Sequence, residues 1–246
     1  MLWAGKRRSY AEAVENRRKT FARLLMLLMF FMAFEVLSGL FLTAYSAGST
    51  GMSPTVLPSD HLLATPLAFG PRTPFGKLPG FAKPERGDLV LVQPPYAEAP
   101  GFFVDLANSF VRFVTFQRFS PFAGGASRPM AGPIIARVVG LPGDSISMED
   151  FVFKAKAAGE EHFLTEFELS SHRYDISKSA LPELWQDGFP ASGTMAARSL
   201  GPDEYFLAGD ARSGTSDSRL WGPVHADRFL AKVLLRYWPP SRFGIP

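Results

Sequence analysis

A run of 22 mostly apolar residues, from Leu24 to Tyr45, constrains this chain more than any other stretch. An α-helix of that length is about 33 Å long, which is enough to cross the hydrocarbon core of a bilayer. A cleaved secretory signal has a shorter apolar core of about 7–15 residues, although Thr43 to Ala47 offers small residues of the kind found at a cleavage site. We therefore expect an uncleaved transmembrane anchor over residues 21–45.

Basic residues precede this run and few follow it. They are Lys6, Arg7, Arg8, Arg17, Arg18, Lys19 and Arg23. Positive charge on one flank keeps that flank in the cytoplasm. We therefore expect residues 1–20 to be a cytoplasmic basic N-terminus and residues 46–246 to be an extracytoplasmic domain, which at roughly 200 residues is large enough to bury a core.

Glu35 lies near the middle of the predicted anchor. An ionised acid at that depth costs roughly 2.5–3.5 kcal/mol on insertion scales. The residue indicates either a contact with another membrane protein or a protonated side chain that a strongly apolar helix tolerates, and the sequence leaves both interpretations open.

The composition excludes several classes of function. There is no cysteine, which rules out a disulfide framework, a cysteine zinc site and a cysteine nucleophile. The four histidines show no metal-ligand spacing, so we expect neither a metal nor another cofactor. The net charge is +3 and the basic residues cluster only at the N-terminus, a pattern that favours the lipid bilayer over nucleic acid as a partner.

Short β-branched runs bounded by glycine and proline predict a mainly β domain. The runs are Leu89–Val92, Ile134–Val139, Tyr205–Ala208 and Ala231–Tyr237. Residues 101–119 carry phenylalanines at helical intervals and predict an inserted amphipathic helix, which lies either in the membrane interface or against the domain. Residues 145–201 carry no motif and are interpreted as a variable insertion.

Three short motifs follow one another in this domain. They read Ser-Thr-Gly-Met-Ser-Pro-Thr at 49–55, Ala-Arg-Val-Val-Gly-Leu-Pro-Gly-Asp at 136–144, and Gly-Asp-Ala-Arg with Asp-Ser-Arg-Leu-Trp-Gly inside 209–222. Together with Arg-Gly-Asp at 86–88, these blocks resemble the bacterial type I signal peptidases. The resemblance implies a serine protease anchored in the inner membrane, an antiparallel β-domain on the periplasmic side, and signal peptides of exported preproteins as ligands.

The resemblance also implies where the catalytic pair should stand. The family has a serine nucleophile at position 51 and a general-base lysine at position 136, and this chain has Gly51 and Ala136. Hydrolysis by a Ser/Lys pair requires an alcohol oxygen beside a neutral amine. The sequence therefore predicts no functional catalytic residue at the family positions.

At other positions this chain matches the family more closely than at positions 51 and 136. The resemblance implies oxyanion or supporting roles for Ser49, Thr215, Asp217, Ser218 and Arg219. It also implies a groove for an extended peptide, lined by Ser46, Ala47, Gly48, Ser49, Thr50, Met52, Pro133, Ile134 and Ile135. Adding a strand to a groove needs backbone hydrogen bonds and small pockets, and it needs no nucleophile.

Neighbouring residues are poor substitutes for the missing pair. In an extended segment Ser53 is displaced from position 51 by roughly 6.6 Å, Thr50 faces the other side, and Arg137 keeps its proton. We therefore expect a catalytically impaired or inactive signal peptidase homologue that retains its peptide groove. The alternatives are an active signal peptidase with a non-standard nucleophile, and a structural membrane protein whose groove is occluded.

Overall fold

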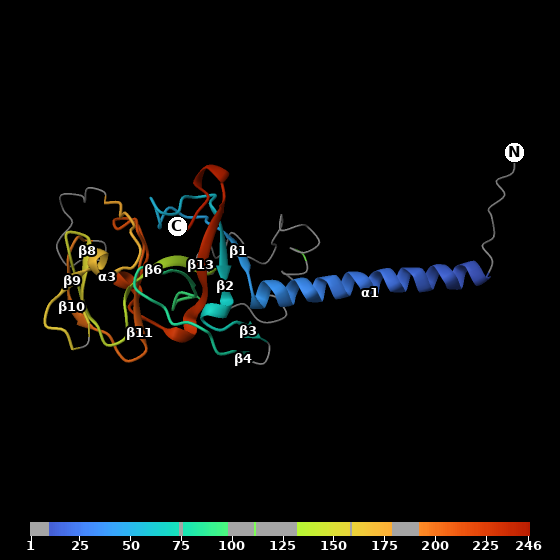
Figure 1. Ribbon diagram of the computed structural model, residues 1–246, viewed down its shortest axis with the longest axis horizontal. Coiled ribbons are helices and arrows are strands. Elements are labelled where there is room, and N and C mark those ends of the chain that lie inside the picture. Colours follow the sequence, from blue (N-terminus) through green and yellow to red (C-terminus); the bar gives the residue numbers. More distant parts are fainter. Residues whose placement is uncertain (1–9, 74–75, 98–110, 112–131, 158, 179–191) are drawn as a thin grey trace.

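The computed structural model describes residues 10–73, 76–97, 111, 132–157, 159–178 and 192–246. These residues form a long N-terminal helix and a body of antiparallel strands (Figure 1). The prediction of a mainly antiparallel β fold behind an N-terminal helix is therefore confirmed. The helix predicted over 101–119 lies outside the described residues except for Val111, as do residues 158 and 179–191 of the predicted insertion.

Helix α1 runs from Tyr10 to Leu40, so it begins before the predicted anchor and ends inside it. The end of the predicted anchor lies instead in strand β1 (Thr43–Ser46), which pairs with β2 (His61–Thr65). The prediction of helix up to residue 45 is wrong because pairing with β2 satisfies the backbone of this segment in extended form. Among the described residues, no helix is both long enough and apolar enough to cross a membrane. The side chain of Glu35 lies outside the described part of α1.

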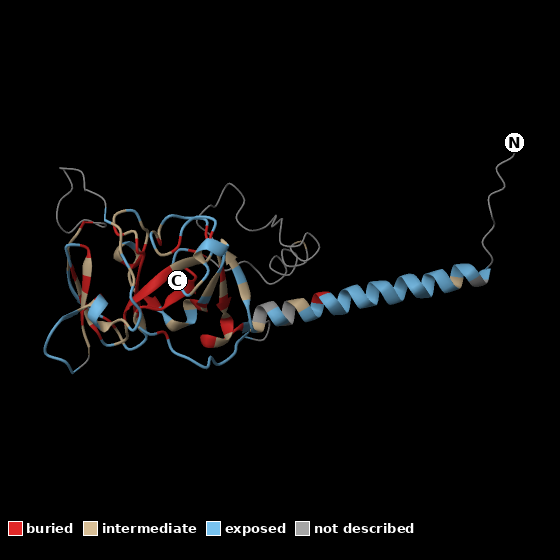
Figure 2. Cartoon of the chain, turned by 45° about the horizontal axis from the view of Figure 1, so that its top comes forward, coloured by how far each residue is buried: buried red, intermediate tan, exposed pale blue. Residues whose placement is uncertain are grey.

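A seven-stranded sheet forms the centre of the body. Its strands lie in the order β1, β2, β13 (Phe229–Trp238), β5 (Leu89–Val92), β6 (Ile134–Gly140), β11 (Glu204–Ala208) and β12 (Val224–His225). Val90 and Val92 of β5 pack into one apolar cluster, and Leu89 and Leu91 pack into another. Because successive side chains of a strand point to opposite faces, both faces of this sheet are covered by apolar side chains. Figure 2 shows the buried residues gathered inside the body and exposed residues along most of α1.

The predicted insertion contributes a second sheet. Its strands lie in the order β10 (Met195–Ser199), β7 (Ser145–Glu149), β8 (Val152–Lys156) and β9 (Leu164–Thr165), followed in the chain by helix α3 (Glu166–Leu169). A tight turn joins β6 to β7, in which the carboxylate of Asp144 accepts from the amide of Leu141 at 2.7 Å and Gly143 adopts a φ of 83°. Glycine takes this left-handed conformation at little cost.

A third apolar cluster joins the two sheets. Phe153 of β8 is fully buried in it and packs edge-on against Phe206 of β11, with ring centroids 5.6 Å apart. The insertion is thus part of the core of the body. In Figure 1, α1 projects from one end of the body, and β8, β9, β10 and α3 lie at the other end.

Short elements complete the described chain. They are η1 (Pro66–Ala68), β3 (Arg72–Thr73), β4 (Gly76–Lys77), α4 (Ser218–Trp221), η2 (Ala226–Arg228) and η3 (Pro240–Arg242).

We predict that Phe153→Ala lowers the free energy of unfolding by about 3–5 kcal/mol, because it leaves a cavity between the two sheets. Phe163→Ala is the matched control, since Phe163 is 40% exposed, and it should change stability by about 0.5 kcal/mol or less. Urea denaturation followed by tryptophan fluorescence measures both. Equal effects for the two variants would contradict a core shared by the sheets.

Candidate active site and peptide groove

Residues 47–60 form the loop between β1 and β2. Met52 and Val56 are buried in the apolar cluster on one face of the main sheet, and the amide of Val56 donates to the Met52 carbonyl at 2.8 Å. The amide of Ser53 donates to the Thr50 carbonyl at 3.0 Å. The loop is therefore anchored by its apolar residues, which leaves Ser49 and Thr50 exposed.

The backbone of Gly51 is held by the segment that follows β11. Its carbonyl accepts from the amide of Ala211 at 3.0 Å and from the hydroxyl of Thr215 at 3.1 Å. A Cβ placed on Gly51 would lie 3.3 Å from the Thr215 methyl carbon, 3.5 Å from the Thr215 hydroxyl oxygen and 3.7 Å from the Ser49 hydroxyl oxygen. The structure thus brings Ser49, Gly51 and Thr215 together, and we call these three residues the Gly51 cup.

Gly209 allows this close approach. A Cβ at Gly209 would lie 2.6 Å from the carbonyl oxygen of Gly51 and 2.3 Å from the Thr215 methyl carbon. Contacts that short do not occur between real atoms, so any side chain at position 209 would push the cup apart. The glycine of the Gly-Asp-Ala-Arg motif is therefore required by packing.

Ala136 lies in β6 with its side chain buried in the apolar cluster that also contains Val90, Val138 and Leu207. Its neighbour Arg137 is paired with Ala208 of β11, immediately before Gly209. Position 136 therefore lies in the strand next to the end of β11, and Gly209 at that end approaches the backbone of Gly51. A lysine at position 136 would be taken out of water, and desolvation lowers the pKa of an amine.

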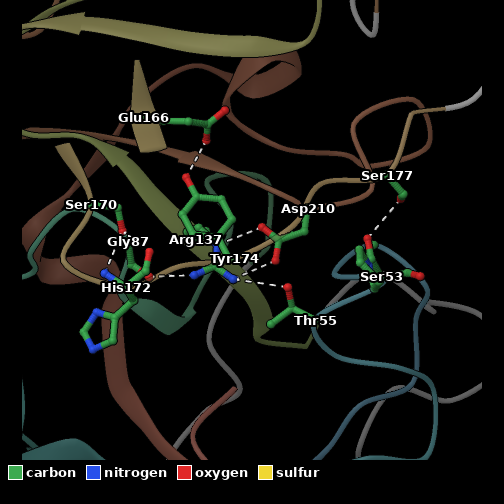
Figure 3. A network of polar contacts seen from close by, with 12 residues as sticks. Ser53, Thr55, Gly87, Arg137, Glu166, Ser170, His172, Tyr174, Ser177 and Asp210 are labelled. Carbon is green, nitrogen blue, oxygen red and sulfur yellow. Dashed lines mark hydrogen bonds and ion pairs between the residues drawn. The ribbon is translucent and has the colours of Figure 1, made fainter. Parts of the chain in front are cut away.

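Arg137 is buried at the centre of a polar network between the sheets (Figure 3). Its guanidinium donates to both oxygens of Asp210, at 2.8 and 2.7 Å, and to the carbonyl of Gly87 at 2.7 Å. It also lies 3.8 Å from the centre of the Tyr174 ring. Sequence reasoning considered Arg137 only as a substitute base and missed this role. The available signal was that Arg137 and Asp210 each stand inside one of the family-like motifs.

The same network extends into the insertion through Tyr174. Its hydroxyl donates to Glu166 at 2.7 Å, and Glu166 is also paired with the buried Arg212. Burial, and after it the negative charge of Glu166, raise the pKa of Tyr174, so the phenol stays protonated and remains a donor. The network therefore carries two buried arginines, each matched by one carboxylate.

The remaining predicted support residues surround α4. Asp217 caps this helix and forms an ion pair with Arg219 at 2.7 Å, and its carboxylate accepts from the amide of Gly209 at 3.1 Å. The hydroxyl of Ser218 accepts from the amide of Leu207 at 3.0 Å. These contacts hold the strand end next to the cup, so the three residues position the segment and do not themselves border Gly51.

The two predicted groove segments lie together. The hydroxyl of Tyr45 donates to the carbonyl of Pro133 at 2.8 Å, and Ile135 packs against the cluster that contains Ala47 and Met52. Ser46, Gly48, Ser49 and Thr50 are exposed, whereas Ile134 and Ile135 are half-buried. The exposed part of the loop is therefore accessible to a ligand next to β6.

Two further residues hold the loop, and sequence reasoning missed both. Ser177 of the insertion donates its hydroxyl to the Ser53 carbonyl at 3.0 Å, and its backbone bonds to Asp210 and Arg212. From the C-terminal side, Arg242 donates to Asp60 at 2.8 Å and to the Thr55 carbonyl at 3.1 Å. Their sequence neighbourhoods carry no motif, so only the tertiary structure reveals them.

Comparison with known proteins identifies the family. The family model described as "Signal peptidase, peptidase S26" matches residues 18–238, which is most of the chain. The chain belongs to the signal peptidase family. The antiparallel body described above is therefore the body of a signal peptidase relative.

Individual relatives are distant. The chain is 22% identical over 198 residues to probable signal peptidase I-2 of Synechocystis, covering 80% of this chain and 63% of that protein. It is 24% identical over 194 residues to probable signal peptidase I-1 of the same organism, covering 78% and 74%. It is 23% identical over 200 residues to thylakoidal processing peptidase 1 of Arabidopsis thaliana, covering 80% and 42%. The chain therefore spans less than two thirds of the first and third of these proteins.

We predict that Gly209→Ala destabilises the protein by about 3 kcal/mol, the upper end of the usual range for overpacking. Gly214→Ala is the matched control in the same segment, because a Cβ at Gly214 meets nothing within 4 Å. The control should leave stability unchanged or raise it by up to about 1 kcal/mol. Thermal denaturation of both variants checks the difference, and a Gly209→Ala protein as stable as the native one would refute the close packing of the cup.

Proposed function

We propose that this chain is a signal peptidase homologue without peptidase activity that still binds the extended signal peptides of exported proteins. Alternatively, it regulates or scaffolds an active peptidase. The observation that carries the proposal is the Gly51 cup: the surrounding side chains are in place, and the residue that would attack a peptide bond is a glycine.

The chemistry of hydrolysis requires two groups that this site lacks. An attacking oxygen must lie about 3–3.5 Å from the carbonyl carbon, and a neutral amine must take its proton. We assign the nucleophile position to Gly51 and the base position to Ala136, which offer a hydrogen and a methyl group. Losing both members of such a pair leaves only the residual rate that binding and the remaining donors supply.

A second candidate function is an active signal peptidase with a relocated nucleophile. The Ser49 hydroxyl favours it, because this oxygen lies 3.7 Å from the place that a side chain at position 51 would take. Cleavage of a purified preprotein by the native chain, abolished by Ser49→Ala, would support this candidate and overturn the inactive one.

We also propose that α1 attaches the protein to the inner membrane, with the basic N-terminus in the cytoplasm and the β body on the extracytoplasmic side. Large apolar side chains of α1 are exposed, among them Phe21, Leu24, Met29 and Phe30, which are all more than 60% exposed. A helix with apolar side chains on all faces needs an apolar environment to cover them. Lipid supplies that environment, and it would place the body close to translocated chains.

The decisive experiment restores the catalytic pair. The double variant Gly51→Ser with Ala136→Lys should cleave a purified preprotein, whereas the native chain and either single variant should not. The matched control is Gly48→Ser with Ala136→Lys, because a Cβ at Gly48 meets no atom within 4 Å and stands outside the cup. A folded double variant that binds no peptide and cleaves nothing would contradict an intact groove.

Membrane attachment has its own test. The triple variant Leu24→Glu, Met29→Glu and Phe30→Glu should move into the soluble fraction on alkaline extraction of membranes, since each charge is costly in hydrocarbon. A control with Asn16→Gln and Arg17→Gln should remain in the pellet. Native protein that is itself released by the extraction would refute attachment through α1.

A further inference from the structure

We propose that the second sheet carries a docking surface for a partner protein, and that the partner binds it through a segment rich in apolar and basic side chains. The surface consists of Phe163, Leu164 and Phe167, which we call the insertion patch. These large apolar side chains are 40%, 42% and 41% exposed. The patch lies outside the peptide groove, so this inference goes beyond the proposed function.

The patch is presented on a rigid base. Leu164 belongs to β9, and Phe167 belongs to α3, whose first residue, Glu166, is buried. The carboxylate of Glu166 accepts from the amide of Phe153 at 3.0 Å and pairs with the buried Arg212. The exposed residues beside Glu166 are therefore fixed before a partner arrives. Binding to a preordered surface loses less conformational entropy, and aromatic side chains are enriched in protein interfaces.

The chain around the patch is acidic. From residue 157 to residue 172 it contains four glutamates and no lysine or arginine. One of the four, Glu166, is buried and neutralised by Arg212. The other three are exposed: Glu160, Glu161 and Glu168. A partner with lysine or arginine beside its apolar side chains complements this rim, whereas an acidic partner is repelled by it.

The rim keeps its negative charge at neutral pH. The side-chain hydroxyl and the amide of Thr165 both donate to Glu168 at 2.7 Å, and these hydrogen bonds lower the pKa of that carboxyl group. Lys156 lies against the patch from β8, with its ammonium nitrogen 5.7 Å from the centre of the Phe163 ring. The three exposed carboxylates outnumber this ammonium, so the rim remains acidic.

Lipid is the other candidate for an exposed apolar patch, and two observations disfavour it. In Figure 1, β9 and α3 lie at the end of the body opposite to α1. Under the proposed attachment through α1, the patch is therefore held away from the bilayer. Exposed carboxylates are also repelled by the negative surface of anionic lipids, which attracts basic segments instead. A protein segment is thus the occupant that the patch fits.

The first test uses a ten-residue synthetic peptide in which leucine and phenylalanine alternate with lysine. In one analogue glutamate replaces lysine, and in another serine replaces leucine and phenylalanine. Binding to the full-length protein in a neutral detergent is measured by fluorescence anisotropy, with detergent micelles alone as the blank. The lysine peptide should bind at least tenfold more tightly than either analogue, and its affinity should fall as salt is added. Equal binding of the three peptides would overturn the inference.

Variants of the patch locate the effect. Phe163→Ser with Leu164→Ser should lower the affinity for the lysine peptide at least tenfold. Glu160→Gln with Glu161→Gln should lower the affinity and weaken its dependence on salt. The matched control is Phe81→Ser, because Phe81 is 87% exposed and lies outside the insertion. All four substituted patch residues are exposed, so thermal denaturation should show no loss of folding. A control that loses as much affinity as the patch variants would contradict the site.

Hydrogen exchange distinguishes the other occupants. The lysine peptide should slow exchange of backbone amides within residues 159–168 of the protein in lipid nanodiscs. Slow exchange there without peptide, caused by the lipid, would assign the patch to the bilayer and overturn the inference. A dimer that the Phe163→Ser, Leu164→Ser variant dissociates would assign it to a second copy and overturn it as well. Protection of residues 46–51 instead would place the peptide in the groove, which refutes the docking surface and leaves the proposed function intact.

Discussion

The buried guanidinium of Arg137 is the interaction on which the arrangement of this site depends. Its side chain is 1% exposed, and an unpaired charge at that depth would destabilise the fold by several kcal/mol. Asp210 must therefore stay against it, and Asp210 stands between Gly209 and Ala211, the residues that touch and bond the backbone of Gly51. The Arg137–Asp210 pair takes no part in chemistry. It fixes the segment that follows β11, and that segment in turn holds the backbone of Gly51, which lies far away in the sequence.

The contacts that hold the residues around Gly51 and Ala136 do not depend on any catalytic group. Thr215 and Ala211 hold the carbonyl of Gly51, Asp217 holds the amide of Gly209, and an apolar cluster surrounds Ala136. Each of these contacts stabilises the folded protein whether or not a reaction occurs. Under the proposal that position 51 has lost a hydroxyl and position 136 an amine, reactivity is removed at little cost to stability, because neither group takes part in these contacts.

The insertion belongs to the same assembly. Tyr174 lies on the Arg137 guanidinium, and Ser177 bonds the Ser53 carbonyl of the loop as well as the segment after β11. The insertion also supplies Glu166, the partner of the buried Arg212 that follows β11. The second sheet therefore helps to define the geometry of the loop that carries Gly51.

The sequence alone determined the family, the antiparallel β fold and the chemical identity of positions 51 and 136, because motif spacing, strand patterns and residue types are local properties. It also suggested that Ser49 and Thr215 accompany position 51. Only the tertiary structure decided that Thr43–Ser46 is a strand and not the end of a helix, since a partner strand satisfies its backbone. It also decided that Arg137, Tyr174, Glu166 and Arg212 form one network, and that Ser177 and Arg242 hold the loop. Those contacts join residues up to 187 positions apart, and the burial that makes them matter exists only after the two sheets have packed.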